Sequence, residues 1–214
     1  MRSTASDLRA NGHRLNGEPK AEANATERLS PVDKAYLLNI ARQSVGYFLE
    51  RGQKLEIEPG EVPSQRLTEN GASFVTLHEL GHLRGCIGTL EAHRPLVFDV
   101  LENALCSAFE DPRFHPLRRD DLGAVRFSIS VLTRPAPLMV KDADDLLERL
   151  THKHGLIIRK GWNRATYLPA VWEQIPDKRH FLDSLCAKAG LRPDEWKDTA
   201  GMEFLTYEAD EFSE

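Results

Sequence analysis

The amino-acid sequence predicts an α+β fold, with a mixed sheet and helices packed on it. Helical and strand patterns both occur along the 214 residues, but they do not alternate strictly as they would in a doubly wound sheet. Hydrophobic residues make up 41% of the chain and charged residues 29%. This is enough apolar material for one core, or for one core with a smaller lobe packed on it.

The helices are recognised by their ends as well as by their apolar spacing. Ser30 is a suitable N-cap, Pro31 suits the first helical position and Gly52 suits the end, so a helix is expected between them. In the longer segments apolar residues recur at intervals of three and four. The expected helices are Ser30–Gly52, Pro95–Ala108, Asp142–Leu150 and Asp177–Gly190.

Strands are expected where β-branched and aromatic residues form short runs or alternate with polar residues. The alternation is clearest where Phe127, Ile129 and Val131 are separated by serines. Gly81 supplies a turn between the first two strands. The expected strands are Phe74–Leu77, Leu83–Leu90, Arg126–Leu132, Leu156–Ile158, Ala165–Leu168 and Glu203–Phe212.

The charge balance argues against a nucleic-acid partner. The formal net charge is −5 and the sequence pI is about 5.9, so the chain lacks the basic surplus that neutralises phosphates. Short basic clusters such as Arg118-Arg119 are interpreted as solvated faces. No segment is apolar over the length needed to cross a membrane, and no membrane partner is expected.

Residues 1–30 are expected to be a flexible N-terminal extension, and residues 31–214 to form the folded domain. The extension has no hydrophobic segment of the kind found in secretory signals. Cys86, Cys106 and Cys186 are widely spaced, without a C-x-x-C pair for zinc or an iron–sulfur pattern. These features predict a cytoplasmic protein with reduced thiols and no cofactor.

Residues His78 to His82 (HELGH) match the H-E-x-x-H motif of zinc hydrolases. In those enzymes a helix places both histidines on one face, and the glutamate activates the metal-bound water. Here the preceding run Phe74–Leu77 and the glycines that follow favour a β-hairpin. A third ligand would have to come from Glu102 or Glu110 on the next helix. A zinc-dependent hydrolase is therefore kept only as an alternative.

The segment Leu83–Leu90, with the sequence LRGCIGTL, carries a family resemblance. Segments on both sides agree with the same family in order and spacing. They are Phe74–Leu77, Glu110–Leu117, Ile129–Leu132, His154–Leu156, Leu168–Trp172 and Phe181–Leu191. On these motifs the chain resembles the AmmeMemoRadiSam system protein A family, which contains an AMMECR-type domain, over roughly Pro31–Phe212.

The resemblance implies an α+β fold with a larger and a smaller lobe, and it implies that the LRGCIG hallmark lies near the groove between them. Relatives often accompany a Memo-like protein and a radical-SAM protein, so these are the protein partners that it implies. The family brings no assigned reaction. In the sequence pattern of this family, the segment from His78 to His82 corresponds to a variable connection before the hallmark. This also argues against a zinc site.

Arg84, Gly85, Cys86 and Gly88 are an unusual set for a plain strand. Glycines in strands occur where the backbone bulges or where a ligand approaches closely. The guanidinium of Arg84 can hold a carboxylate or a phosphate, and a nearby cation favours the thiolate form of Cys86. Together with Thr89, these residues form a candidate site for a small anionic ligand, with Cys86 as the catalytic nucleophile.

Two interpretations of Cys86 stay open. It is either a nucleophile facing a cleft or a small buried hydrophobic residue, whereas Cys106 and Cys186 lie in apolar helical patterns and are expected in the core. A nucleophile also needs a base. The histidines available are His78, His82, His115 and His154, and the sequence does not choose among them.

The charged cluster of Glu110, Asp111 and Arg113 follows the second expected helix. It either lines the groove, as further ligand-binding residues, or only terminates the helix. The sequence therefore predicts an enzyme or pathway subunit that binds a small anionic molecule beside Arg84 and Cys86. The alternatives are a non-catalytic partner of Memo-like and radical-SAM proteins, and the zinc hydrolase.

Overall fold

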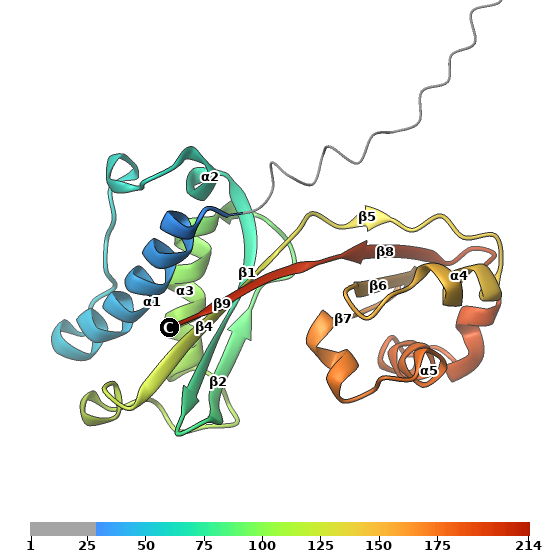
Figure 1. Ribbon diagram of the computed structural model, residues 1–214. Coiled ribbons are helices and arrows are strands. Elements are labelled where there is room, and N and C mark those ends of the chain that lie inside the picture. Colours follow the sequence, from blue (N-terminus) through green and yellow to red (C-terminus); the bar gives the residue numbers. More distant parts are fainter. Residues whose placement is uncertain (1–28) are drawn as a thin grey trace, which may run out of the picture.

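The computed structural model describes residues 29–214 (Figure 1). Most of the expected N-terminal extension, residues 1–30, therefore lies outside the described residues. The two residues of it that are described belong to the folded part. Leu29 is buried in the core, and the hydroxyl of Ser30 accepts a hydrogen bond from the N–H of Asp33 at 3.1 Å, which caps the helix α1 (Pro31–Arg51).

The larger lobe is an antiparallel sheet with helices on one face. Its strands run in the order β2-β1-β4-β9, and the short β3 pairs with one end of β1. Helices α1 and α3 pack against each other over this sheet (Figure 1). The further elements of this lobe are η1 (Pro59–Glu61), α2 (Gln65–Thr68), β1 (Asn70–Glu79), β2 (His82–Gly88), β3 (Arg94–Pro95), α3 (Leu96–Phe109), η2 (Arg119–Asp121), β4 (Val125–Leu132) and β9 (Ala209–Ser213).

The smaller lobe contains a second antiparallel sheet, in the order β5-β8-β6-β7. Its elements are β5 (Ala136–Pro137), α4 (Ala143–Arg149), β6 (Gly155–Lys160), β7 (Asn163–Tyr167), η3 (Pro169–Glu173), α5 (Lys178–Lys188), η4 (Pro193–Lys197) and β8 (Glu203–Tyr207). None of the helices within residues 29–214 combines the length and the apolar character that a membrane crossing requires.

Each lobe has its own hydrophobic core. In the larger lobe, Val75 and Leu77 of β1 and Phe127 of β4 point toward the helices and are fully buried. In the smaller lobe the rings of Trp172 and Phe181 stack with their centroids 3.6 Å apart. A third cluster joins the lobes and consists of Ala72, Leu132, Ile157 and Tyr207.

The α+β class is confirmed, but the expectation of a mixed sheet is wrong, because every strand pairing within the described residues is antiparallel. The predicted last strand, Glu203–Phe212, is also divided. The N–H of Thr133 donates to the carbonyl of Glu208 at 2.9 Å, so the chain leaves one sheet at this point and enters the other. Strands β8 and β9 form a continuous path from the smaller lobe into the larger sheet (Figure 1).

The HELGH segment is the tip of the β1–β2 hairpin. Its turn consists of Leu80 and Gly81, whose φ angles are 51° and 82°. Two consecutive residues with positive φ in a two-residue hairpin loop define a type I′ turn. Leu80 is 87% exposed, so no packing compensates for the left-handed backbone of this residue.

Candidate functional site

Cys86 lines a cavity of about 410 Å³ between the two lobes. One wall is the face of the larger sheet that the helices leave open. The opposite wall is formed by η3 and Leu168 of the smaller lobe. The polar or reactive side chains of the lining are Thr76, His78, Cys86, Ser128, Ser130, Glu173, Glu211 and Ser213.

Four of these side chains form a row across the sheet. The strand register places Cys86 opposite Thr76, Thr76 opposite Ser128, and Ser128 opposite Ser213. Adjacent strands are about 4.8 Å apart, so the row extends over about 14 Å. The hydroxyl of Thr76 donates a hydrogen bond to the sulfur of Cys86 at 3.3 Å. The row thus begins with a thiol and continues with three hydroxyl groups.

His78 is the histidine that shares this cavity with Cys86. It lies two positions beyond Thr76 on β1, so both side chains point to the same face of the sheet. A bulge at Arg84 shifts the β1–β2 register between Leu77 and His78, so His78 lies opposite Leu83 while it shares the cavity face of the sheet with Cys86. The other candidate bases, His82, His115 and His154, are not among the residues that line the cavity.

The two hallmark glycines are explained by close packing. A Cβ atom on Gly85 would lie 2.1 Å from the carbonyl oxygen of Ser107 on α3, and one on Gly88 would lie 2.2 Å from the Cγ of Phe74. The approach of α3 also brings the hydroxyl of Ser107 between β1 and β2. This hydroxyl accepts from the N–H of Ile87 at 2.8 Å and donates to the carbonyl of Val75 at 2.7 Å.

Thr89 anchors the end of the hallmark to a buried carboxylate. Its hydroxyl donates to Asp99 Oδ2 at 2.7 Å, and Asp99 is fully buried. The same oxygen accepts from the N–H of Ser73 at 2.9 Å and from the amide of Asn103 at 2.9 Å. Thr89 therefore helps to satisfy a buried polar network at the junction of β1, β2 and α3.

Asp111 and Arg113 hold the outer edge of β2. The side chain of Asp111 is 2% exposed and accepts hydrogen bonds from the N–H of Cys86 at 2.9 Å and from Arg113 Nη2 at 2.7 Å. Arg113 in turn donates to the carbonyl of Cys86 at 3.2 Å. The hydrogen bonds from Arg113 hold the pKa of Asp111 well below its usual value, against the opposing effect of burial. Glu110 is exposed at the end of α3 and accepts from Cys106 Sγ at 3.5 Å.

Arg84 is directed toward the neighbouring strand. Its Nε atom lies 3.7 Å from a carboxylate oxygen of Glu79, and its side chain is 15% exposed. Its buried Nη1 atom has no hydrogen-bond partner among residues 29–214. Arg84 is not among the residues that line the inter-lobe cavity.

Of the eight site residues that the sequence predicts, the cavity lining includes Cys86 alone. The other seven lie outside the lining: Arg84, Gly85, Gly88 and Thr89 on or just after β2, Asp111 and Arg113 at its outer edge, and Glu110 exposed at the end of α3. Sequence reasoning missed the cavity residues Thr76, Ser128 and Glu211. Their only signal is their position opposite to the buried residues in an alternating strand, and ordinary solvent-facing residues have the same signal.

The three cysteines differ in their surroundings. Burial raises the pKa of both Cys106 and Cys186 to about 11, and the carboxylate of Glu110 adds to the effect at Cys106. Cys186 is fully buried in the smaller lobe, as expected, whereas Cys106 is only partly buried. Cys86 is partly buried and is the cysteine that lines the inter-lobe cavity.

The structure contradicts the zinc-hydrolase alternative. The two histidines lie on strands rather than on a helix, and the register pairs His82 with Glu79. Since neighbouring residues of a strand point to opposite faces, His78 points away from the face that Glu79 and His82 share. Residues 29–214 contain no group of three or more His, Cys, Asp or Glu side chains arranged to hold a metal ion.

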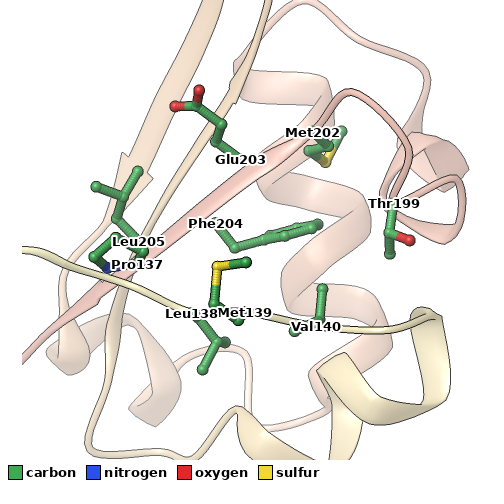
Figure 2. A pocket seen from close by; sticks show the side chains of 9 residues that line it. All are labelled: Pro137, Leu138, Met139, Val140, Thr199, Met202, Glu203, Phe204 and Leu205. Atoms are coloured by element: carbon green, nitrogen blue, oxygen red, sulfur yellow. The ribbon is translucent and has the colours of Figure 1, made fainter.

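A second cavity of about 520 Å³ lies in the smaller lobe and is mostly apolar (Figure 2). Its lining includes Met139, Val140 and Phe204, and the carboxylate of Glu203 points away from these side chains in Figure 2. Its lining contains no cysteine and no histidine, and Thr199 contributes its one hydroxyl group. For this reason the inter-lobe cavity is the better candidate for a functional site.

The fold and this site define a class of two-lobed α+β proteins with a cysteine-bearing strand at the cavity between the lobes. The chain belongs to the AMMECR1 family, whose sequence pattern matches residues 38–212. This confirms the resemblance to proteins with an AMMECR-type domain.

Similar proteins come from archaea. Protein MK0488 of Methanopyrus kandleri is 36% identical over 197 residues, which cover 88% of this chain and 91% of that protein. Protein NEQ441 of Nanoarchaeum equitans is 39% identical over 181 residues, which cover 83% and 98%. Among solved structures, the crystal structure of the uncharacterized protein PH0010 from Pyrococcus horikoshii superposes with a TM-score of 0.75. The two sequences are 31% identical, and the superposition covers 87% of this chain and 93% of that one.

Proposed function

We propose that the protein binds a small molecule in the inter-lobe cavity and that the thiol of Cys86 reacts with it. The observation that carries the proposal is that the sulfur of Cys86 shares the cavity with a hydroxyl donor, Thr76, and with a base, His78. A cavity with a few converging polar groups is the usual form of a small-molecule site.

The three side chains match the needs of a thiol nucleophile. The reactive species is the thiolate, so the thiol proton needs an acceptor and the sulfur needs a hydrogen-bond donor. In the proposal the imidazole of His78 accepts the proton and the hydroxyl of Thr76 donates to the sulfur. The Asp111–Arg113 pair fixes the backbone of Cys86 from the other side of β2 and so keeps the thiol at the cavity wall.

Asp111 and Arg113 thus support the site without lining it. Gly85, Gly88 and Thr89 help to pack the same strand, whereas Arg84 and Glu110 are given no role in this proposal. The guanidinium of Arg84 lies beside Glu79 and outside the cavity lining. Arg84 therefore does not support an anionic ligand in this cavity.

The proposal is tested by the rate of alkylation with iodoacetamide at each cysteine of the folded protein, read by peptide mass spectrometry at pH 8. The pKa values near 11 keep Cys106 and Cys186 protonated at this pH, so these two thiols are internal controls. We expect Cys86 to react at least about tenfold faster than either control. His78→Asn is expected to slow Cys86 alone. Equal, slow alkylation of all three thiols would refute the proposal.

The second candidate function is a non-catalytic partner protein, which the same experiment separates from the first. An unreactive Cys86 in a folded protein would favour a binding role for the groove. Memo-like and radical-SAM proteins remain the proposed partners in that case, on the family resemblance alone.

A further inference from the structure

The cavity beside Cys86 continues into a second hollow. This hollow has a volume of about 710 Å³. It shares five lining residues with the cavity: Pro169, Ala170 and Glu173 of η3, and Ala209 and Glu211 of β9. Glu173 and Glu211 line both spaces, so these two carboxylates lie at the junction. The polar row from Cys86 ends at Ser213 on β9, after about 14 Å. Glu211 lies two residues from Ser213 on the same face of β9, so a ligand that follows the row must turn along this strand to reach the junction.

The charges along this path are mostly negative. Besides the two junction carboxylates, Glu208 lines the second hollow. None of the three forms an ion pair with another residue in the range 29–214. The opposing groups in the lining are Lys153, His152 and His78, and a ring nitrogen of His152 is hydrogen-bonded to the carbonyl of Pro176 at 2.9 Å.

Three of the nearby cations are paired with carboxylates, whereas Arg126 forms no ion pair within residues 29–214. The guanidinium of Arg113 is paired with Asp111 at 2.7 Å, that of Arg84 lies beside Glu79, and the ammonium of Lys34 is paired with Asp210 at 2.6 Å. Arg126 lies on β4 opposite His78, but it is not among the lining residues. The continuous groove therefore offers a thiol at one end, neutral hydroxyl groups along its floor and carboxylates at the far end.

We propose that the ligand of this groove is an extended cation, an amine or a guanidinium compound, whose charged end lies between Glu173 and Glu211 while its reactive end lies at Cys86. This inference rests on the proposed function and adds the charge and the length of the ligand. Glu173 and Glu211 are exposed, so water screens their attraction for a ligand cation and a modest effect on the rate is expected.

Thiol reagents with a charged end at a chosen distance test this inference. The probes are three methanethiosulfonates with an eight-carbon chain that ends in an ammonium, a hydroxyl or a carboxylate, together with the two-carbon ammonium and carboxylate reagents. The sulfur of Cys86 attacks the thiosulfonate sulfur, a disulfide forms, and methanesulfinate leaves with the bonding electron pair. Rates at Cys86 are divided by the rates of the same reagents with free glutathione.

We expect the eight-carbon ammonium reagent to react at least about fivefold faster than the hydroxyl reagent, and the carboxylate reagent to be the slowest. The two-carbon reagents are expected to differ less, because their charge stays near Cys86. Glu173→Gln and Glu211→Gln are expected to remove most of the difference among the long reagents. Glu203→Gln is the matched control, since this carboxylate lies at the other cavity and leaves the rates unchanged.

Equal rates for the three long reagents, or a faster carboxylate reagent, would overturn the inference while leaving the reactive thiol of the proposed function in place. Failure of Cys86 to react with any reagent, long or short, would instead overturn the proposed function and the inference together.

Discussion

The main-chain N–H of Cys86 donates a hydrogen bond to the buried carboxylate of Asp111 at 2.9 Å. Strand β2 is at the edge of its sheet, so this N–H points away from β1 and would otherwise lack a protein partner. The loop after α3 therefore continues the hydrogen bonding of the sheet with side chains. It fixes the position of the strand that presents the thiol to the cavity.

Asp111→Asn is expected to lower the free energy of unfolding at pH 7 by about 2 kcal/mol, because it removes the buried charge that accepts from Cys86 and Arg113. Solvent screens the half-exposed Arg113, which limits the loss. The folded-state pKa of Asp111 is depressed, so its stabilising effect is complete above the ordinary value of 3.8 and declines as the pH falls below it.

Urea denaturation at pH 7 and at several values between pH 4 and pH 2 measures both effects. The variant is expected to lose less stability than the wild type over the acidic range. Asp120→Asn, at an exposed carboxylate, is the control for the change of net charge. Parallel losses in the variant and the wild type below pH 4 would contradict the role given to Asp111.

Gly85→Ala is expected to lower the free energy of unfolding by about 3 kcal/mol. The added Cβ atom would lie 2.1 Å from the carbonyl oxygen of Ser107, and a helix backbone cannot move away cheaply. Gly123→Ala is the matched control, because no atom lies within 4 Å of the added Cβ there. Thermal and chemical denaturation of the two variants measure the difference, and similar small effects in both would show that α3 does not approach β2 this closely.

Leu80→Asn is expected to raise the free energy of unfolding by about 1 kcal/mol. Leu80 occupies the first central position of a type I′ turn with φ of 51°, where asparagine is favoured and a branched apolar side chain is strained. The side chain of Leu80 is largely exposed, so little packing is lost. Unfolding curves measured by circular dichroism test this, and a destabilised variant would mean that the exposed leucine makes a contact in solution.

Thr76→Val is expected to slow the alkylation of Cys86 about threefold to tenfold at neutral pH, because it removes the hydroxyl that donates to the sulfur while keeping the shape of the side chain. Ser130→Ala is the control, since Ser130 lines the same cavity outside the row that contains Cys86. Equal slowing in both variants would indicate a general change in the cavity rather than a specific hydrogen bond.

Much of the fold follows from local rules of the sequence. Ser30, Pro31 and Gly52 bound α1 as predicted, because caps and termini are set by neighbouring residues. The HELGH segment is a hairpin for the reason expected, since Gly81 takes a positive φ and strand-forming residues precede it. The division of the last strand at Glu208 is not visible locally, because it depends on Thr133 in a distant part of the chain.

The candidate site is predicted only in part. Cys86 stands out in the sequence because it lies between two glycines, and the cavity does include it. The glycines themselves have another cause, the close approach of Ser107 and Phe74, which no single sequence reveals. His78 and Ser128 come to the cavity through the strand register, and a register is a long-range property of the sheet.

The central claim is that the thiol of Cys86 opens into the cavity between the lobes, and a crystal structure of the protein after stoichiometric carbamidomethylation tests it most directly. We expect the new amide group to lie inside the cavity, near Thr76 and Ser128 and against η3. An adduct that points to bulk solvent outside the cavity, or a protein in which Cys86 stays unmodified while folded, would show that the thiol does not open into the cavity.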